Sequence, residues 1–380
     1  MKHFTYLTFL IISVSCQTKL NNQANFINIY TIDTVIIDSK ERLLDLETNI
    51  FRSDLNKRKS SIFLFNKFKH SIDEVDLDDL EFVNSYQFDA DGPDGTGEYV
   101  YDIYEISDSL FFIKSYDRSA IFHKNSELIY KINWANSIDS NGLEFGKIPQ
   151  KEIAVGVNDL KVFGLSFENR NREVFLDILS VKDNSVERFD IDSEKSYHNF
   201  VLAIDDPQNY TFIDPIVYLT SENDQIIISH QYSSEIFIFN GEGRFLKFLK
   251  FEPSMTPNRA SELKDKSIHT IEQIEEEYQK LLEQVRFAPP VWDAVNKRYF
   301  RLSARRIFKE REAKGALLPE LQEIMVYLSV FDAEFNLTSE VLIPELTSEF
   351  VKYFSKNGKL WVFENLADEL GFIVIEIETS

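Results

Sequence analysis

The chain carries an internal repeat that restricts its fold more than any other feature. Residues 108–113 align without a gap on residues 224–229, at an offset of 116 residues. Tyr116 then falls on Tyr232, and two further apolar runs align at the same offset. In both copies short apolar runs alternate with turn residues, which is typical of antiparallel strands. Repeats of about 40 to 50 residues with four strands each are typical of β-propeller blades.

Weaker copies of the repeat extend the pattern to six blades. Their approximate bounds are residues 40–92, 93–146, 147–195, 196–255, 287–346 and 347–379. The last blade has only three strands, whereas a spare strand lies at 27–37. A propeller commonly pairs an N-terminal strand with its last blade, because this pairing removes an exposed edge. We therefore predict an all-β fold, a six-bladed propeller of four-stranded antiparallel blades, as a single domain over residues 27–380.

One segment departs from the strand pattern. Between 267 and 286 the apolar residues recur at helical spacing with glutamates between them, and Pro289 and Pro290 follow. The segment predicts an inserted amphipathic helix whose apolar stripe packs on the propeller, although a partner helix or a lid is the alternative. A second, shorter helix is predicted at 317–322.

The N-terminus predicts export. Lys2 and His3 precede an apolar run over residues 4–14 that is too short to span a bilayer, and Ser15 and Cys16 follow. The segment Ser13-Val14-Ser15-Cys16 resembles the lipobox of a bacterial lipoprotein signal. This resemblance implies a signal peptide over 1–15, a lipidated Cys16 as the membrane attachment and a polar tether over 16–26. Because Ser13 stands where leucine is commonest, ordinary secretion is the alternative.

Composition narrows the classes of partner and the sources of stability. The net charge of −22 repels phosphate backbones, so we expect no nucleic-acid partner. Cys16 is the only cysteine, and its lipidation would leave no thiol for a disulfide. Packing must therefore hold the fold, and 33 Phe with 16 Tyr supply apolar surface suited to strands.

Two motifs carry a resemblance to a known family. They are the run from Gly92 to Glu98, which precedes a strand, and Val291-Trp292-Asp293, which leads into residues 298–301. With the lipobox, they resemble an uncharacterised family of Gram-negative lipoproteins with six-bladed, TolB-like propellers and a domain of unknown function. The resemblance covers nearly the whole chain after the signal. It implies the fold and a place in the cell envelope, and it supplies no reaction, cofactor or catalytic residue.

One basic segment is the candidate ligand-binding site. If 297–311 is a strand, alternation places Tyr299, Arg301 and Arg305 on one face. Two guanidiniums beside a phenol can grip a carboxylate or a sulfate. We favour the alternative that these arginines pair with carboxylates of the protein itself.

Other candidate motifs do not meet the requirements of a site. The acidic run Asp89–Gly95 has proline and aspartate where a calcium loop needs a ligand and glycine, so a turn between blades is favoured. The five histidines after the signal lack metal-ligand spacing, and Gly164–Glu168 ends in glutamate where a nucleophile elbow needs glycine. We expect no metal, cofactor or catalytic residue. Tyr116, Tyr232 and Trp361 are aromatics that can stack on sugars, but core positions are favoured for them.

Two functional hypotheses from different classes remain. The first is a non-catalytic binding or scaffold protein for a peptide, a glycan or a partner protein of the envelope. The alternative is an extracytoplasmic hydrolase or lyase with its site in the central funnel, for which two inward carboxylates would be needed. Gln17 after the lipid site favours the outer membrane of a Gram-negative bacterium, on its periplasmic or its surface face.

Overall fold

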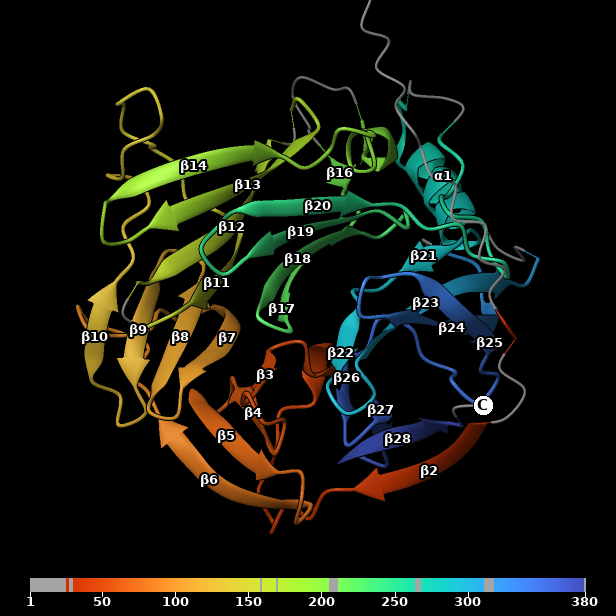
Figure 1. The fold of residues 1–380 in the computed structure, drawn as a ribbon, viewed down its shortest axis with the longest axis horizontal. Coiled ribbons are helices and arrows are strands. Elements are labelled where there is room, and N and C mark those ends of the chain that lie inside the picture. The colour runs from red at the N-terminus through yellow and green to blue at the C-terminus, as the bar shows by residue number, and fades with distance from the viewer. Residues whose placement is uncertain are drawn as a thin grey trace, which may run out of the picture.

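The computed structural model shows a ring of β-sheets around a central axis (Figure 1). It describes residues 25–26, 30–157, 159–168, 170–204, 211–263, 268–310 and 318–378. Six sheets of four or more strands make up the ring, and the predicted six-bladed β-propeller is confirmed. The signal peptide, Cys16 and most of the predicted tether lie outside the described residues.

The first four blades each contain four antiparallel strands, which follow one another from the innermost to the outermost position. Blade 1 comprises β3 (Ser53–Leu55), β4 (Ser61–Asn66), β5 (Ser71–Asp76) and β6 (Glu81–Gln87). Blade 2 comprises β7 (Val100–Ser107), β8 (Leu110–Ser115), β9 (Ser119–His123) and β10 (Leu128–Lys131). Blade 3 comprises β11 (Lys151–Val155), β12 (Lys161–Glu168), β13 (Glu173–Ser180) and β14 (Ser185–Asp190). Blade 4 comprises β17 (Val217–Glu222), β18 (Gln225–His230), β19 (Ile236–Asn240) and β20 (Phe245–Leu249).

The last two blades are less regular. In blade 5, β21 (Arg286–Phe287) and β22 (Val291–Asp293) share the innermost position, followed by β23 (Arg298–Phe308), β24 (Leu321–Asp332) and β25 (Leu337–Leu342). The short β1 (Asn25–Phe26) pairs in parallel with β25. Blade 6 comprises β26 (Tyr353–Lys356), β27 (Lys359–Leu366), β28 (Glu369–Ile377) and, outermost, β2 (Tyr30–Ile36). The connections hold the 3-10 turns η1 (Glu47–Ile50) and η2 (His198–Phe200) and the pair β15 (Leu202–Ala203) and β16 (Phe212–Ile213).

The N-terminal strand closes the ring, as the sequence predicts. All of β2 pairs with β28, from Tyr30 opposite Ile377 to Ile36 opposite Gly371. Blade 6 therefore joins β2 to the last strand, β28, in one sheet (Figure 1). This pairing covers an edge that β28 would otherwise expose.

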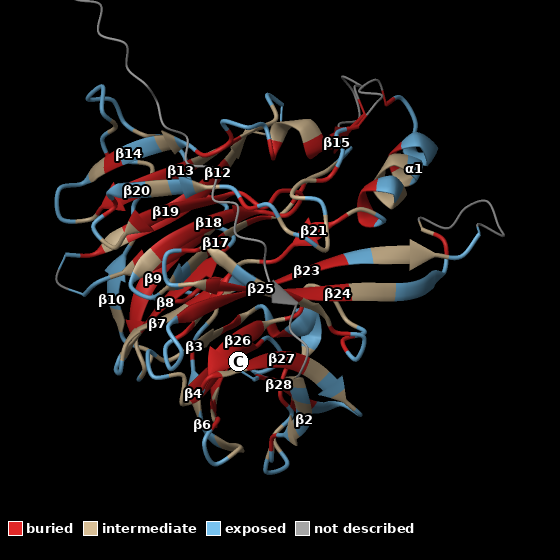
Figure 2. Ribbon diagram, turned by 45° about the vertical axis from the view of Figure 1, so that its right-hand side comes forward, coloured by how far each residue is buried: buried red, intermediate tan, exposed pale blue. Residues whose placement is uncertain are grey.

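The gapless repeat corresponds to equivalent strands two blades apart. The strands β8 and β18 are the second strands of blades 2 and 4, and β9 and β19 are the third. Apolar residues of adjacent blades pack together between the sheets. The strands that carry them are largely buried (Figure 2). The propeller is held by these layers of aromatic and branched side chains.

The inserted helix is confirmed, with shorter bounds than predicted. The helix α1 (Ile271–Leu282) begins at a capping box of Thr270 and Gln273, which satisfies backbone donors of its first turn. Ile274 and Leu281 are buried in a cluster with Phe200 and Tyr232, so the apolar stripe packs on blade 4. Within the described residues, no helix is long and apolar enough to cross a membrane.

The second predicted helix is wrong. Residue 317 lies outside the described residues, and Leu321 begins β24. Leu321 pairs with Phe308 at the far end of the β23–β24 hairpin. The two strands have 11 and 12 residues, longer than a blade needs, so backbone pairing with β23 overrides the local helical preference.

The two ends of the ring differ. Every innermost strand starts at one end, which we call the mouth, and runs to a hairpin turn at the other, which we call the turn end. At the mouth, the backbone N–H of Lys352 donates to the carbonyl oxygen of Asn49, 3.2 Å away. At the turn end, Asn296 donates to the carbonyl oxygen of Gly358, 3.5 Å away, between blades 5 and 6.

Candidate functional site at the ring axis

Charged side chains of both signs gather around the ring axis. Burial lowers the pKa of the Lys352 ammonium, and Asp54, Glu222 and Asp102 oppose this effect. These three carboxylates belong to blades 1, 4 and 2, whereas Lys352 begins blade 6. Only a position near the axis brings one ammonium close to three different blades.

We call Asp54, Lys352, Asp102 and Lys151 the axial cluster. Asp54 and Lys352 form its first half. The Lys352 Nζ donates to the carbonyl oxygen of Ser53 at 2.8 Å, and an Asp54 Oδ2 accepts the backbone N–H of Glu105 at 2.8 Å. Burial raises the pKa of Asp54 to about 6, although the ammonium of Lys352 acts in the opposite direction. Asp54 thus carries a proton that is exchangeable near neutral pH.

Asp102 and Lys151 form the second half. In the described part of the chain, no hydrogen bond and no ion pair within 4.0 Å reaches the Asp102 carboxylate. Burial raises the pKa of Asp102, and Lys151 is the strongest of the charges that lower it. Within the described ranges, the one hydrogen bond of the Lys151 Nζ is long, 3.4 Å to the carbonyl oxygen of Val217. Both residues keep some exposure, so the Asp102 carboxylate and the Lys151 ammonium have hydrogen-bonding capacity to spare.

Contacts across the axis link opposite blades at the turn end. The Lys59 Nζ of blade 1 lies 3.1 Å from Glu222 of blade 4 and donates to the carbonyl oxygen of Trp292 of blade 5, also at 3.1 Å. The backbone N–H of Trp292 donates to the same Glu222 carboxylate at 3.1 Å. Lys57 and Asp224 add an exposed ion pair of 3.2 Å. These contacts bridge the turn end, so a ligand that left them intact would approach the axial cluster from the mouth.

The pKa of Asp54 predicts a pH effect on stability. The folded protein holds this proton up to about pH 6, but the unfolded chain releases it near 3.8, so the contribution of protonated Asp54 is lost as pH rises between these values. Asp54→Asn should remove that loss, because the amide stays neutral. The difference in unfolding free energy between the variant and wild type should therefore increase, in favour of the variant, by up to about 2 kcal/mol from pH 4 to pH 7. Urea unfolding at four pH values measures it, and a difference independent of pH contradicts it.

The structure does not bring the three sequence-predicted residues together in one open site. Tyr299 is fully buried, and its ring stacks on that of Phe335 with centroids 3.9 Å apart. Arg301 is also buried, whereas Arg305 is exposed, with its guanidinium 3.2 Å from the sulfur of Met325. The strand and its alternation are as expected, but Tyr299 and Arg301 point into the contact between blades 4 and 5.

Among the described residues, Arg301 binds backbone carbonyls and no carboxylate. It donates to the carbonyl oxygens of Ala288 at 2.8 Å, Ser234 at 2.7 Å and Ser233 at 3.4 Å. Burial lowers its pKa to about 10, so the guanidinium stays charged at neutral pH. Its contacts tie blade 4 to blade 5, and its role in ligand binding stays a prediction.

Comparison with known proteins gives the family. The family model described as "Domain of unknown function (DUF4221)" matches residues 25–342. The chain belongs to the DUF4221 family. A solved DUF4221 protein from Bacteroides vulgatus has a TM-score of 0.59 at 12% identity, covering 92% of this chain and 99% of that one. At this identity the likeness shows the shared fold.

Weaker similarities extend to other solved structures. A protein from Bacteroides fragilis that is described as exported has a TM-score of 0.49 at 9% identity. The match covers 94% of this chain and 98% of that one. A gluconolactonase from Xanthomonas campestris has a TM-score of 0.41 at 7% identity, and the match covers 85% of this chain and 84% of that one. No curated protein matches the sequence.

The structure of this DUF4221 protein explains the residues of its two family motifs. The glycine-rich run joins β6 to β7, so it is a connection between blades. Gly95 has no room for a side chain, since a Cβ would lie 2.3 Å from the carbonyl oxygen of Asp91. In the second motif Asp293 and Arg298 form a buried ion pair of 2.9 Å within the β22–β23 turn. Among the described residues, no group of three His, Cys, Asp or Glu side chains could hold a metal ion.

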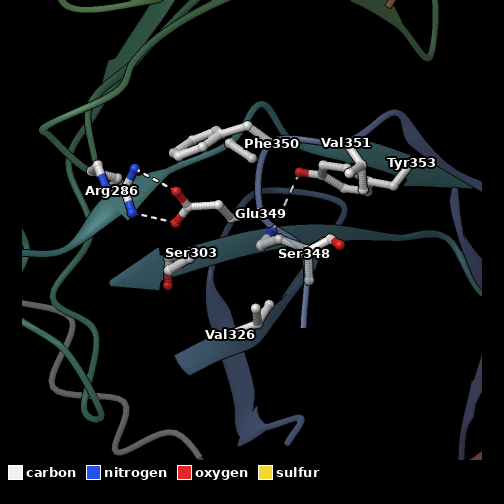
Figure 3. Close-up of a pocket in the computed structure, with 11 residues that line it drawn as sticks. Arg286, Ser303, Val326, Ser348, Glu349, Phe350, Val351 and Tyr353 are labelled. Atoms are coloured by element: carbon white, nitrogen blue, oxygen red, sulfur yellow. Dashed lines mark hydrogen bonds and ion pairs between the residues drawn. The ribbon is translucent and has the colours of Figure 1, made fainter. Parts of the chain in front are cut away.

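A second buried ion pair lies beside a pocket of about 290 Å³, part of it open to solvent (Figure 3). Arg286 makes two contacts with Glu349, one of 2.8 Å, and Arg306 binds the same carboxylate. The side chain of Glu349 is 3% exposed, so its charge is balanced within the protein. The pocket walls are largely apolar, and we assign this pair to the packing of blades 5 and 6.

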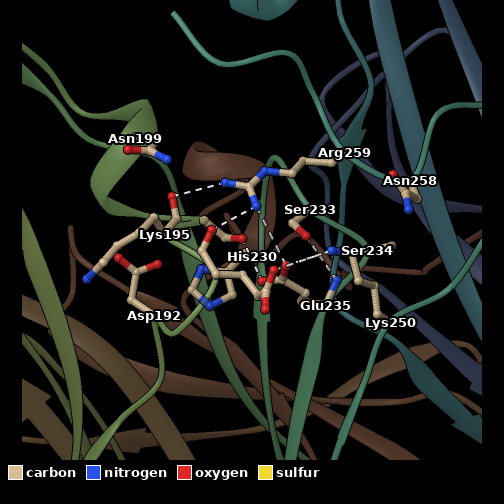
Figure 4. Close-up of polar contacts among 12 residues, drawn as sticks. Asp192, Lys195, Asn199, His230, Ser233, Ser234, Glu235, Lys250, Asn258 and Arg259 are labelled. Carbon is tan, nitrogen blue, oxygen red and sulfur yellow. Dashed lines mark hydrogen bonds and ion pairs between the residues drawn. The ribbon is translucent and has the colours of Figure 1, made fainter. Parts of the chain in front are cut away.

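A third network surrounds Glu235 in the loop after β18 (Figure 4). The Ser196 hydroxyl donates to Glu235 at 2.5 Å, and Arg259 lies 3.9 Å from the carboxylate. Arg259 also donates to the carbonyl oxygen of Glu194 at 2.8 Å. Because Ser234 accepts from Arg301, this network continues into the contact between blades 4 and 5. Its charges serve the connection between blades and leave the axial cluster as the candidate site.

Sequence reasoning did not find the axial cluster. Its members lie in different blades, as far apart in the chain as Asp54 and Lys352, and form no local motif. One weak signal was available. A charged residue stands within two residues of the start of four innermost strands, at Asp54, Asp102, Lys151 and Lys352.

Proposed function

We propose that this DUF4221 protein is an extracytoplasmic ligand-binding propeller, whose site consists of Asp54, Asp102, Lys151 and Lys352 at the ring axis. One observation carries the proposal: Asp102 and Lys151 face the axis half-buried, with opposite charges and without a direct ion pair. Charges left apart in this way cost desolvation without the gain of a close contact. A polar ligand with both donors and acceptors offsets that cost when it binds between them.

The charge balance of the cluster favours a polar ligand without net charge. Two carboxylates and two ammonium groups oppose one another, and Glu222 is already balanced by Lys59. A peptide segment or a glycan from the envelope supplies donors and acceptors of this kind.

A melting-temperature screen tests this proposal. The chain from Thr18 onward is mixed with peptides and with neutral oligosaccharides, since a ligand at 100 times its Kd stabilises the native state by about 2.7 kcal/mol. Asp102→Asn should abolish the rise in melting temperature with any ligand found, because a neutral amide replaces the charged carboxylate that accepts hydrogen bonds from the ligand. Asp94→Asn, which changes an exposed carboxylate in the glycine-rich connection, is the matched control and should keep it. Hits that are insensitive to Asp102→Asn would contradict the axial site.

The proposal includes a lipid anchor at Cys16 and a place on the outer membrane. The lipobox-like segment and the polar tether support it, and β1 begins nine residues after Cys16, at the outer edge of blade 5. Radiolabelled palmitate should enter the wild-type chain and not the Cys16→Ala chain, which should leave the membrane fraction. An unlabelled wild-type chain in the soluble fraction would support ordinary secretion.

The second candidate function is hydrolysis or lyase chemistry at the same axial cluster. It is favoured by two carboxylates near the axis, one with a pKa of about 6, which suits a general acid or base. A substrate whose turnover is lost in Asp54→Asn and in Asp102→Asn, with binding retained, would establish this function.

A further inference from the structure

The repeat places one tyrosine in two different environments. Tyr116 and Tyr232 occupy the same repeat position, one and two residues after the second strands of blades 2 and 4. Tyr232 is 2% exposed, because it stacks on Phe200 and joins the cluster beneath α1. Tyr116 is 72% exposed. The helical insertion covers the position in blade 4 and leaves it open in blade 2.

Tyr116 is part of a group of exposed tyrosines at the mouth of blade 2. Its ring meets that of Tyr101 edge to face, with centroids 6.4 Å apart and planes 75° apart. Its backbone N–H donates to the carbonyl oxygen of Tyr99 at 3.0 Å. Tyr99 and Tyr101 are 64% and 44% exposed. Tyr101 and Tyr116 thus form two walls at nearly a right angle, which we call the aromatic corner.

A β-bulge turns the corner outward. Val100 pairs with Ser115 and Asp102 pairs with Lys114, so Tyr101 has no partner in the ladder. A bulge of this kind re-aims a side chain and is common beside functional sites. Because Ser115 and Lys114 are adjacent in β8, the bulge also places Val100 and Asp102 on opposite faces of the sheet.

The surrounding loops brace the corner. Arg118 donates to the carbonyl oxygens of Gly92 and Gly95 at 3.2 Å each, which ties the loop after β8 to the glycine-rich connection. Gly97 packs so closely on Ser115 that a Cβ would lie 2.4 Å from its hydroxyl oxygen. These contacts fix the backbone of the loops that carry Tyr99 and Tyr116, which reduces the ordering that a ligand would have to impose on them.

The aromatic corner lies directly beside the axial cluster. Tyr101 precedes Asp102, whose carboxylate is the unpaired acceptor, and neighbouring residues of a chain are about 3.8 Å apart. The corner and Asp102 thus lie at the same end of β7, so a ligand bound at the mouth over the start of this strand could contact both.

We infer that the aromatic corner and the axial cluster together bind a neutral saccharide, with one sugar ring against Tyr101 and Tyr116 and its hydroxyls toward Asp102 and Lys151. This inference rests on the proposed function and names its ligand class. The face of a tyrosine ring is apolar and suits the C–H face of a pyranose. Sugar hydroxyls both donate and accept, as a site with one free carboxylate and one weakly bonded ammonium requires. The chain's net charge of −22 disfavours an acidic polysaccharide.

Isothermal titration with two classes of probe tests the inference. The probes are neutral tetrasaccharides (cellotetraose, maltotetraose, mannotetraose and chitotetraose) and tetra-alanine, each with the chain from Thr18 onward. We expect at least one tetrasaccharide to bind, and Tyr116→Ala to weaken it about tenfold or more, because aromatic anchors dominate binding energy. Asp102→Asn should weaken it as well. Tyr130→Ala is the matched control, since Tyr130 is 44% exposed on β10, the outermost strand of the same blade.

Each contrary result has a distinct meaning. Binding of tetra-alanine that depends on Asp102, with no saccharide bound, overturns the saccharide and keeps the proposed function. Saccharide binding that Tyr116→Ala and Tyr130→Ala leave equally unchanged overturns the aromatic corner. No binding of either probe, with a flat melting-temperature screen, overturns the corner and the axial site together. Because Tyr116 is exposed, its variant should melt at the wild-type temperature, and a loss of binding then reports on the ligand contact.

Discussion

Deleting residues 30–36 should cost the protein its cooperative fold. These residues are the whole of β2, and their loss exposes the β28 edge along all seven paired positions. This pairing completes blade 6, which packs against blade 1, so the expected loss is comparable with the total stability of a domain, about 5–15 kcal/mol. Urea unfolding followed by tryptophan fluorescence, with light scattering for aggregates, measures the effect.

The matched control for this deletion is a chain that begins at Asn25. It lacks the predicted signal and most of the tether but keeps β2, and it should unfold like the longer chain. A synthetic peptide of residues 30–36 should partly restore the deleted protein, because it can pair with the free edge of β28. A deleted chain that unfolds cooperatively at the wild-type urea concentration would show that blade 6 closes without its fourth strand.

The second large effect is expected at Arg301. Arg301→Met keeps much of the side-chain volume but removes the guanidinium, and the carbonyl oxygens of Ala288, Ser233 and Ser234 lose their donor. Breaking a buried charged network costs about 3–5 kcal/mol, because the remaining polar groups stay buried without partners. Chemical denaturation of the purified variant gives the change in unfolding free energy.

Arg305→Met is the control, since Arg305 lies on the same strand and is exposed. Its effect should stay within about 0.5 kcal/mol. An Arg301→Met protein with wild-type stability but without ligand binding would instead support the ligand-binding role predicted for Arg301 from the sequence.

Repetition made the ring predictable. Alternating apolar residues and the copies at an offset of 116 give the blades, and the missing fourth strand of the last blade gives the closing strand. These features follow from local patterns, because every blade must bury two faces and pair its edges. The helix α1 was predictable for the same reason, since its apolar spacing depends on the helix alone.

Features that depend on neighbouring blades were not predictable. Leu321 has an apolar helical context, but a long partner strand recruits it into β24. Tyr116 and Tyr232 share a repeat position, and only the covering helix separates a core residue from an exposed one. Arg301 looked like a binding residue because alternation gives a face without showing what lies opposite. The axial cluster depends on ring closure, which places Lys352 near residues almost 300 positions earlier in the chain.

The contacts of Lys59 with Glu222 and Trp292 restrict how a long polymer can be bound. They join blades 1, 4 and 5 across one end of the axis, so a polymer threaded through the ring would have to break them. Whatever reaches Asp54 and Lys352 must arrive and depart by the same route. A glycan chain would then be held by its terminus, with the remaining sugars outside. The amount of protein bound would then depend on the number of chain ends and not on chain length. Cutting a polymer into shorter pieces would therefore increase the number of sites at which the protein binds.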